Sequence, residues 1–223
     1  MPKAVIFGVN GILIGPVDLH ARAWQNTFSD FDHEVASGDV RSQMGKCDDQ
    51  LMPAFLSKEK LDARGEALDE YHGQVPKERY LPQITLLPGC ATRCRGCKPT
   101  APDRLGHLRQ EDELQAYKLA AGTENLLDAE GSSDDAEESK PAPEIFSIVI
   151  RHLGGLIPEQ VTMIGYTSYD TGAAAKAGLH TIDLPCGGWS EVDLKKAGCI
   201  ATYKDPADLL AQYDTSPLAP SQA

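Results

Sequence analysis

The apolar residues of this chain occur in two patterns, short continuous runs and repeats at helical spacing. The continuous runs are rich in β-branched residues and lie close to glycine or proline, which predicts buried strands. They are Lys3–Phe7, Val161–Gly165, Leu179–Leu184 and Cys199–Tyr203. Since helical segments separate these runs, the sequence predicts an α/β fold with a Rossmann-like parallel sheet covered by helices on both faces.

The helical repeats form one long block near the N-terminus and single helices after it. From Val17 to about Gln83, the apolar positions follow helical spacing, with Ser57 as a candidate N-cap. Further helices are expected at Glu113–Ala121, at Ala142–Leu153, before Gly178, between Ser190 and Gly198, and at Pro206–Tyr213.

These elements suggest one domain with an insertion. The 223 residues suit an α/β core formed by residues 1–15 and 84–215, with a helical subdomain inserted at residues 16–83. Residues 216–223 are rich in Pro and Ser and are expected to form a flexible tail.

The chain is acidic, with a formal net charge of −12. This charge opposes binding to nucleic acid and to anionic membrane surfaces, and no basic patch overrides it. The densest acidic run, Asp128–Glu138, is interpreted as a solvated loop. No apolar run approaches the roughly 18 residues of a membrane span, and Lys3 leads directly into a strand, so a cytoplasmic location is expected.

Ligands of parallel sheets bind beyond the carboxyl ends of the strands, here in the loops that follow Phe7 and Ile164. Three segments carry the candidate chemistry: Gly8–Leu13, Ser139–Pro143 and Gly165–Asp170. In order and spacing they resemble the motifs of the haloacid dehalogenase (HAD) superfamily, in its phosphoglycolate phosphatase and β-phosphoglucomutase branch. The resemblance implies a HAD-like core, a helical cap over the site, and Mg²⁺-dependent phosphoryl transfer through an aspartyl-phosphate.

The first family motif, Asp-x-Asp-Gly-Thr, is changed at the positions that carry the reaction. Gly8 stands where the family has its nucleophilic aspartate, and it cannot form an aspartyl-phosphate. Asn10 stands at the general acid and base position, where an amide cannot exchange a proton near neutral pH. Gly11 is retained and preserves the turn, while Ile12 replaces the threonine.

The second motif, a Ser or Thr that holds a phosphate oxygen, is expected at the end of the next strand. Gly106–Gln110 contains neither residue, and the preceding Cys90–Asp103 is rich in Arg, Cys, Gly and Pro. We interpret this sheet element as damaged or rebuilt. Its loss would leave the sheet one strand short with an exposed edge, which predicts low stability or a dimer.

The third and fourth motifs survive in part. Lys140 matches the family lysine that neutralises the nucleophile and the phosphate. In the fourth motif, Gly-Asp-x-x-x-Asp, Tyr166 replaces the first Mg²⁺-binding aspartate and Asp170 matches the second. Because a neutral phenol is a poor ligand for a hard cation, Mg²⁺ binding is predicted to be weak or absent. With carboxylates lost and Lys140 kept, the pocket is expected to bind phosphate or a phosphorylated metabolite without turning it over.

Two further groups of residues are candidates for ligand contact. His20 and Arg22 begin the helical insert, where the cap residues of the family face the substrate. Three cysteines have the C-x₃-C-x₂-C spacing of a [4Fe–4S] ligand set or, together with His107, of a zinc site. These are Cys90, Cys94 and Cys97, and the favoured interpretation is three unrelated thiols in an irregular segment.

The leading functional hypothesis is therefore a phosphatase-like pseudoenzyme that needs no cofactor. Two alternatives stay open. One is an active or weakly active phosphomonoesterase or phosphomutase that uses other residues, such as Asp18 or Asp170. The other is an interaction protein that uses the surface of the helical insert. The oligomeric state is open in all three.

Overall fold

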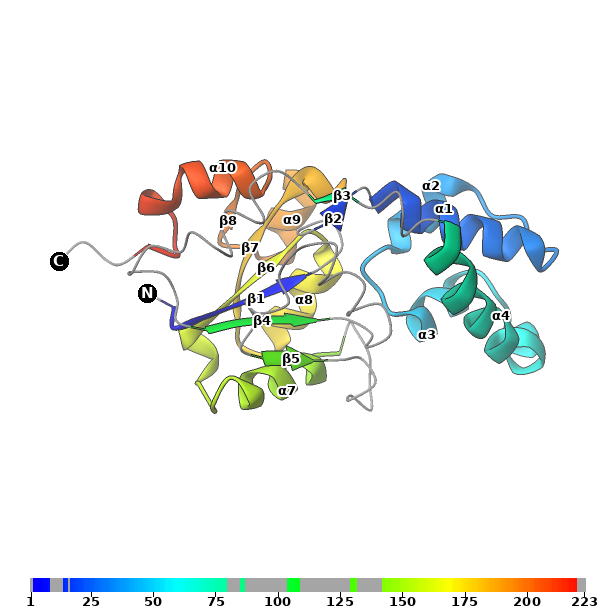
Figure 1. The fold of residues 1–223 in the computed structure, drawn as a ribbon, viewed down its shortest axis with the longest axis horizontal. Coiled ribbons are helices and arrows are strands. Elements are labelled where there is room, and N and C mark those ends of the chain that lie inside the picture. Colours follow the sequence, from blue (N-terminus) through cyan, green and yellow to red (C-terminus); the bar gives the residue numbers. More distant parts are fainter. Residues whose placement is uncertain are drawn as a thin grey trace.

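A computed structural model of the 223-residue chain defines the fold. It describes residues 2–8, 14–15, 17–79, 85–86, 104–108, 129–131 and 142–219. A parallel sheet forms the centre, helices lie on both of its faces, and a block of helices lies beyond one end of the strands (Figure 1). The predicted α/β fold is confirmed.

The central sheet has six strands in the order β5-β4-β1-β6-β7-β8, and all five pairings are parallel. The strands are β1 (Ala4–Gly8), β4 (Arg104–Leu108), β5 (Ala129–Gly131), β6 (Val161–Gly165), β7 (His180–Asp183) and β8 (Ala201–Thr202). A separate antiparallel pair joins β2 (Ile14–Gly15) to β3 (Thr85–Leu86).

Successive residues of β1 face opposite sides of the sheet, as the period of a strand requires. Ala4 and Ile6 belong to one apolar cluster, together with residues of α7 (Glu144–His152) and α8 (Ser168–Lys176). Val5 and Phe7 belong to another, which also contains Leu209 of α10 (Pro206–Ala211) and residues of the helical block. Both faces of β1 are thus buried, which explains why its sequence is continuously apolar.

The helical block consists of α1 (Val17–Asp30), α2 (Ser37–Gln43), α3 (Asp48–Leu51), η1 (Met52–Ala54) and α4 (Lys58–Arg79). Its centre is the packing of α1 on α4, where the rings of Trp24 and His72 stack at 3.7 Å and Thr27 Oγ1 lies 3.1 Å from His72 Nδ1. Among the residues with a described structure, no helix combines the length and hydrophobicity needed to cross a bilayer.

Short elements lie between the main strands and helices or after them: η4 (Pro158–Gln160), η5 (Pro185–Gly187), α9 (Glu191–Ala197) and η6 (Tyr213–Thr215). The predicted caps of α9 are confirmed. The hydroxyl of Ser190 accepts a hydrogen bond from the Asp193 N–H at 3.1 Å, and Gly198 ends the helix with a left-handed φ of 107°.

Residues 90–103 of the sheet element that was interpreted as damaged or rebuilt lie outside the described residues, but the structure rules out a lost strand at residues 104–108. These residues form β4, which pairs with β1 from Ala4↔Arg104 to Gly8↔Leu108 and also pairs with β5. The segment contains no proline, so every backbone N–H is available for pairing with a neighbouring strand. Pairing with β1 and β5 therefore forms the strand even though its side chains show no strand pattern. The sheet is therefore not short of this strand.

The tail prediction is wrong for residues 216–219. The Ser216 hydroxyl donates to the carbonyl of Tyr213 at 2.7 Å, and Leu218 is completely buried in the cluster that contains Leu209. Leu218, two residues into the segment, holds it against the apolar cluster, which composition alone did not reveal.

Candidate functional site

The carboxyl ends of four neighbouring strands lie together at the side of the sheet that faces the helical block (Figure 1). Gly8 of β1 pairs with Leu108 of β4, and Gly165 of β6 pairs with Asp183 of β7. Because Phe7 pairs with Ile164, Gly8 and Gly165 end adjacent strands. This is the edge at which parallel sheets bind their ligands.

Three of the residues singled out in the sequence are brought to this edge. Gly8 ends β1, Tyr166 follows β6 directly, and Asp170 lies in the first turn of α8. Asn10, Gly11, Ile12 and Lys140 lie outside the described residues, so their assignments stay predictions.

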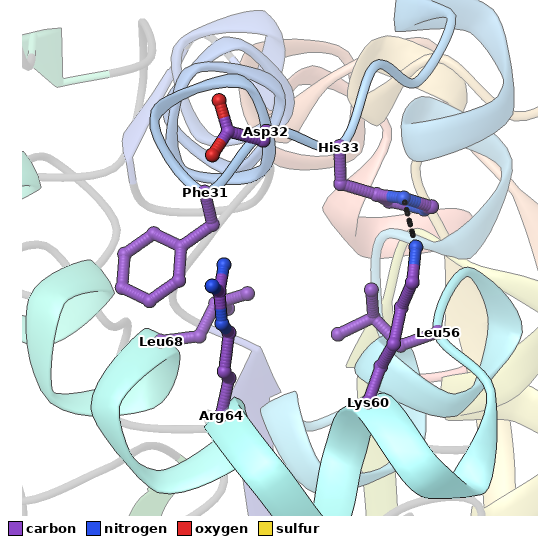
Figure 2. A pocket seen from close by; sticks show the side chains of 7 residues that line it. All are labelled: Phe31, Asp32, His33, Leu56, Lys60, Arg64 and Leu68. Atoms are coloured by element: carbon purple, nitrogen blue, oxygen red, sulfur yellow. Dashed lines mark hydrogen bonds between the residues drawn. The ribbon is translucent and has the colours of Figure 1, made fainter.

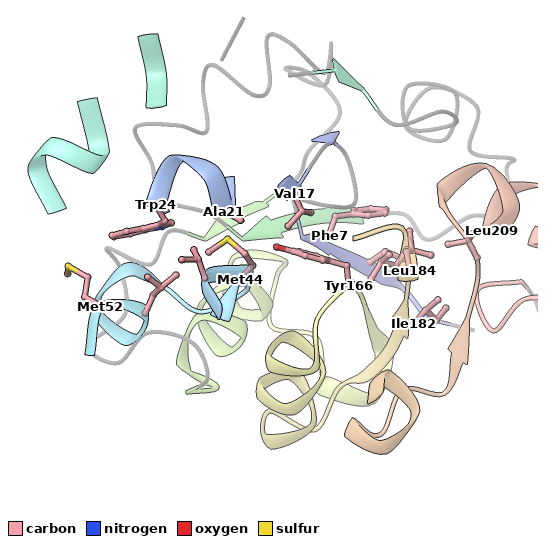
Figure 3. Packing of buried hydrophobic residues seen from close by; sticks show 14 of the residues in the cluster. Phe7, Val17, Ala21, Trp24, Met44, Met52, Tyr166, Ile182, Leu184 and Leu209 are labelled. Atoms are coloured by element: carbon pink, nitrogen blue, oxygen red, sulfur yellow. The ribbon is translucent and has the colours of Figure 1, made fainter. Parts of the chain in front are cut away.

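The side chain of Tyr166 is part of the apolar core. It is 5% exposed and belongs to the cluster that contains Phe7 of β1, Leu184 directly after β7 and Ala21 of α1 (Figure 3). Gly187 of η5 approaches the ring so closely that a Cβ at this glycine would overlap it. Tyr166 therefore fills space between the sheet and the helical block.

Asp170 is 1% exposed, and its carboxylate takes part in the start of α8. The hydroxyl of Thr167, the N-cap, accepts a hydrogen bond from the Asp170 N–H at 3.0 Å and donates one to Asp170 Oδ2 at 2.8 Å. Gly45, with a φ of 103°, lies against the Thr167 side chain, and a Cβ there would overlap that side chain. The loop after α2 therefore packs against the N-cap of α8, whose hydroxyl holds the Asp170 carboxylate.

Asp183 is a buried acid that sequence reasoning missed. The Thr171 hydroxyl donates to Oδ2 at 2.5 Å, and Oδ1 has no hydrogen-bond partner among the described atoms. Burial raises the pKa of Asp183 from 3.8 to about 7; the negative charge of Asp170 adds to this rise, and the Thr171 hydrogen bond opposes it. Burial and then the charge of Asp183 raise the pKa of the nearby Cys199 thiol to about 11. The available signal was a single carboxylate in the apolar run Leu179–Leu184.

A second set of contacts joins the helical block to the loops of the sheet. The Tyr169 hydroxyl donates to the carbonyl of Ser42 at 3.3 Å, and the Lys46 ammonium lies 5.1 Å from the centre of the Tyr169 ring. Arg41 of α2 forms an ion pair with Asp18 and lies against Gly188, whose φ is 95°. Asp18, a candidate substitute nucleophile, is thus engaged by an arginine.

Of the remaining residues that the sequence suggested as ligands, some are described by the structure and others are not. On the first turns of α1, His20 is half-buried and Arg22 is exposed, and their contact with a ligand stays a prediction. The cluster Cys90, Cys94 and Cys97 lies outside the described residues, whereas Cys47, Cys186 and Cys199 are present as thiols. Within the described ranges, no three His, Cys, Asp or Glu side chains are grouped to hold a metal ion.

Comparison with known sequences identifies a matching family model and several relatives. The sequence model of the haloacid dehalogenase-like hydrolases matches residues 110–184. The chain is 26% identical over 201 residues to Protein CbbY of Cereibacter sphaeroides, covering 83% of this chain and 85% of that protein. It is 20% identical over 182 residues to Fructose-1-phosphate phosphatase YqaB of Escherichia coli, covering 81% and 95%. With Protein SUPPRESSOR OF QUENCHING 1, chloroplastic, of Arabidopsis thaliana it shares 28% identity over 160 residues, 68% of this chain but only 15% of that protein.

Comparison of structures shows the same fold. A hydrolase from Pseudomonas syringae superposes with a TM-score of 0.81 at 24% identity, covering 95% of this chain and 98% of that one. CbbY from Rhodobacter sphaeroides, solved in complex with phosphate, superposes with a TM-score of 0.72 at 23% identity, covering 94% and 96%. These likenesses confirm the predicted HAD-like fold.

Proposed function

We infer that this chain, a protein of the haloacid dehalogenase superfamily, has lost the Mg²⁺-dependent phosphoryl transfer of that superfamily and keeps an anion pocket around Lys140. The observation that carries this proposal is the burial of Tyr166 in the apolar cluster, at the position that resembles a metal-binding aspartate. A ring packed in this way excludes the water and charge that a metal centre needs.

The neighbouring residues support the same conclusion. Gly8 has no side chain with which to attack phosphorus, and the Asp170 carboxylate already accepts a hydrogen bond from Thr167. An octahedral Mg²⁺ ion needs oxygen ligands that converge on one point. Gly8, Tyr166 and Asp170 do not fit such a centre, so no catalytic step through Mg²⁺ is proposed.

An active enzyme with a substitute nucleophile is less well supported. A nucleophile has to reach the phosphorus atom of a bound substrate, yet Asp170 is almost completely buried and hydrogen-bonded to Thr167. Asp18 is held by the Arg41 guanidinium. The interaction-protein hypothesis stays a hypothesis.

The anion pocket is proposed from charge and from a relative. Lys140 keeps its positive charge, while Gly8, Asn10 and Tyr166 stand where the family has carboxylates. The charge at these matching positions is therefore less negative than in the catalytic site of the family. The CbbY structure holds phosphate, which supports phosphate or a phosphorylated metabolite as the ligand here.

A phosphatase assay tests the loss of catalysis. We expect the wild-type chain to hydrolyse p-nitrophenyl phosphate no faster with Mg²⁺ than the buffer does. The triple variant Gly8→Asp, Asn10→Asp, Tyr166→Asp is expected to gain Mg²⁺-dependent turnover if it folds, which circular dichroism checks. Mg²⁺-dependent turnover by the wild type would overturn the proposal.

Thermal melts in phosphate test the anion pocket separately. Phosphate is expected to raise the Tm of the wild type, because a ligand that binds only the native state stabilises it. Lys140→Ala should abolish the rise, whereas Lys58→Ala, at an exposed lysine of α4, should keep it. If phosphate does not raise the Tm of the wild type, the anion pocket is refuted. The loss of catalysis is tested separately, by the phosphatase assay.

A further inference from the structure

A pocket of about 340 Å³ opens within the helical block, between the end of α1 and the first turns of α4 (Figure 2). It is remote from the candidate site. The start of α1 lies beside the sheet and its end is distal (Figure 1), and its 14 residues span about 21 Å at 1.5 Å per residue. The pocket shares no residue with the site at the strand ends.

The histidine at the edge of the pocket is held in one orientation. After α1, Asp32 adopts a left-handed φ of 57°, and the His33 N–H donates to the Phe28 carbonyl at 2.8 Å. The ring is held by a bond between Nε2 and the Phe55 carbonyl at 2.9 Å. Because a carbonyl only accepts, Nε2 carries the proton, and Nδ1 faces the Lys60 ammonium at 3.4 Å as an acceptor. His33 thus orients Lys60 toward the pocket.

Lys60 and Arg64 place two positive charges on one face of α4. They are four residues apart, so they repel each other, and neither has an acidic residue three or four positions away along the helix. No ion pair involving either side chain occurs in the described part of the chain, although Asp32 also lines the pocket. Both side chains extend from α4 toward the end of α1 (Figure 2).

Behind the two cations, the wall of the pocket is apolar. It is formed by Phe31, Leu56 and Leu68, of which the two leucines are almost completely buried. A pocket with a mainly apolar wall and a few polar groups is the usual form of a small-molecule site, and 340 Å³ lies at the lower end of the common range.

We propose that this pocket binds a small organic anion whose carboxylate or phosphate group contacts Lys60 and Arg64 and whose apolar body lies against Phe31, Leu56 and Leu68. The guanidinium offers paired N–H donors to a planar or tetrahedral oxyanion, and the ammonium adds a point charge. Burial of the apolar body adds hydrophobic stabilisation. The bound anion would also reduce the repulsion between the Lys60 and Arg64 charges.

Isothermal titration of the full chain with phenyl phosphate, benzoate and neutral benzamide tests this proposal. We expect at least one of the two aryl anions to bind, and the tighter of the two identifies the preferred head group. The double variant Lys60→Gln, Arg64→Gln should weaken that binding by about tenfold or more. Lys58→Gln, at a cation of the same helix outside the pocket, should bind like the wild type.

Lys140→Ala separates this pocket from the proposed phosphate site. The variant should retain the binding that the Lys60 and Arg64 substitutions remove. The proposal is overturned if neither aryl anion binds, if benzamide binds as tightly as the anions, or if the double variant, folded by circular dichroism, binds like the wild type. Binding that Lys140→Ala removes and the double variant keeps would also overturn it.

Discussion

Asp183 combines complete burial with incomplete hydrogen bonding. Its Oδ2 is satisfied by Thr171, whereas Oδ1 has no hydrogen-bond partner among the described residues and would lie 2.8 Å from a Cβ placed on Gly165. A buried carboxylate with a free acceptor is costly when charged and much less so when protonated. The nearby Asp170 increases the cost of the charged form. Asp183 is therefore a site where folding and protonation are coupled.

The coupling predicts how stability changes with pH. Since the pKa of Asp183 is raised from 3.8 to about 7 by folding, the native state holds a proton that the unfolded chain releases between these two values. This contribution to stability is complete below pH 3.8 and falls as pH rises to 7, by at most about 1.4 kcal/mol per pH unit. Urea unfolding of the wild type and of Asp183→Asn from pH 4 to 8 gives the free energy of unfolding of each protein against pH. The difference between these two curves is the contribution of Asp183.

A matched control isolates the buried acid from the other carboxylates. Asp62→Asn removes an exposed carboxylate of α4 and should leave the pH dependence of the wild type unchanged. If the curves of the wild type and Asp183→Asn run parallel across this range, Asp183 does not gain a proton on folding.

The elements around the strand ends are held by close approaches of backbone to side chain. Gly187 in η5 lies against the ring of Tyr166, and Gly45 after α2 lies against Thr167. Each pair joins segments far apart in sequence. The ring of Tyr166 therefore sets how near η5 can approach the loop between β6 and α8.

A double-mutant cycle tests this packing. Gly187→Ala should destabilise the protein by about 1–3 kcal/mol because its methyl group overlaps the Tyr166 ring. Tyr166→Ala should cost about 3–5 kcal/mol as a large-to-small core substitution. In the Tyr166→Ala background, Gly187→Ala should cost much less, because the space is then free. Chemical unfolding measures all four proteins.

Gly172→Ala is the control for this cycle. A Cβ at Gly172, within α8, would meet no atom within 4 Å, so its substitution should stabilise the helix slightly or leave it unchanged. Strictly additive costs for Gly187→Ala and Tyr166→Ala would show that the two residues do not compete for the same space.

Sequence patterns predicted the elements whose own residues carry a clear pattern, such as a continuous apolar run in a buried strand or capping residues at the ends of a helix. Val161–Gly165 is a strand with the predicted bounds, and Ser190 and Gly198 cap α9 as expected. The strand at 104–108 was missed because Arg104, Gly106 and His107 show no apolar alternation, and the pairing with β1 is a property of the assembled sheet.

The location of the site at the strand ends could be predicted from the sequence, but the packing of its side chains could not. The register of β1 against β6 places Gly8 and Gly165 together, as expected for two loops at the carboxyl ends of parallel strands. Whether the Tyr166 ring faces solvent or the core depends on Gly187 and Ala21, which belong to distant segments. Such contacts leave no local pattern in the sequence.

At the scale of the whole molecule, one apolar cluster extends through both parts of the fold. It runs from Leu209 of α10 through Ile182 of β7 and Tyr166 to Trp24 of α1 (Figure 3). The helical block is therefore joined to the sheet by buried apolar surface as well as by the chain connections. Removing either part would expose the half of the cluster that the other part covers, at a cost of about 25 cal/mol per Å².

This continuity predicts that the helical block and the sheet unfold together. The two tryptophans of the chain report on different parts, since Trp24 lies in α1 and Trp189 follows η5. In Trp24→Phe the fluorescence reports on the sheet, and in Trp189→Phe it reports on the helical block. In each variant, the fluorescence and far-ultraviolet circular dichroism transitions in urea should have the same midpoint. A Trp24 transition at lower urea than the circular dichroism transition of the same protein would show that the block opens independently, and that the cluster around Tyr166 does not join the two parts into one cooperative unit.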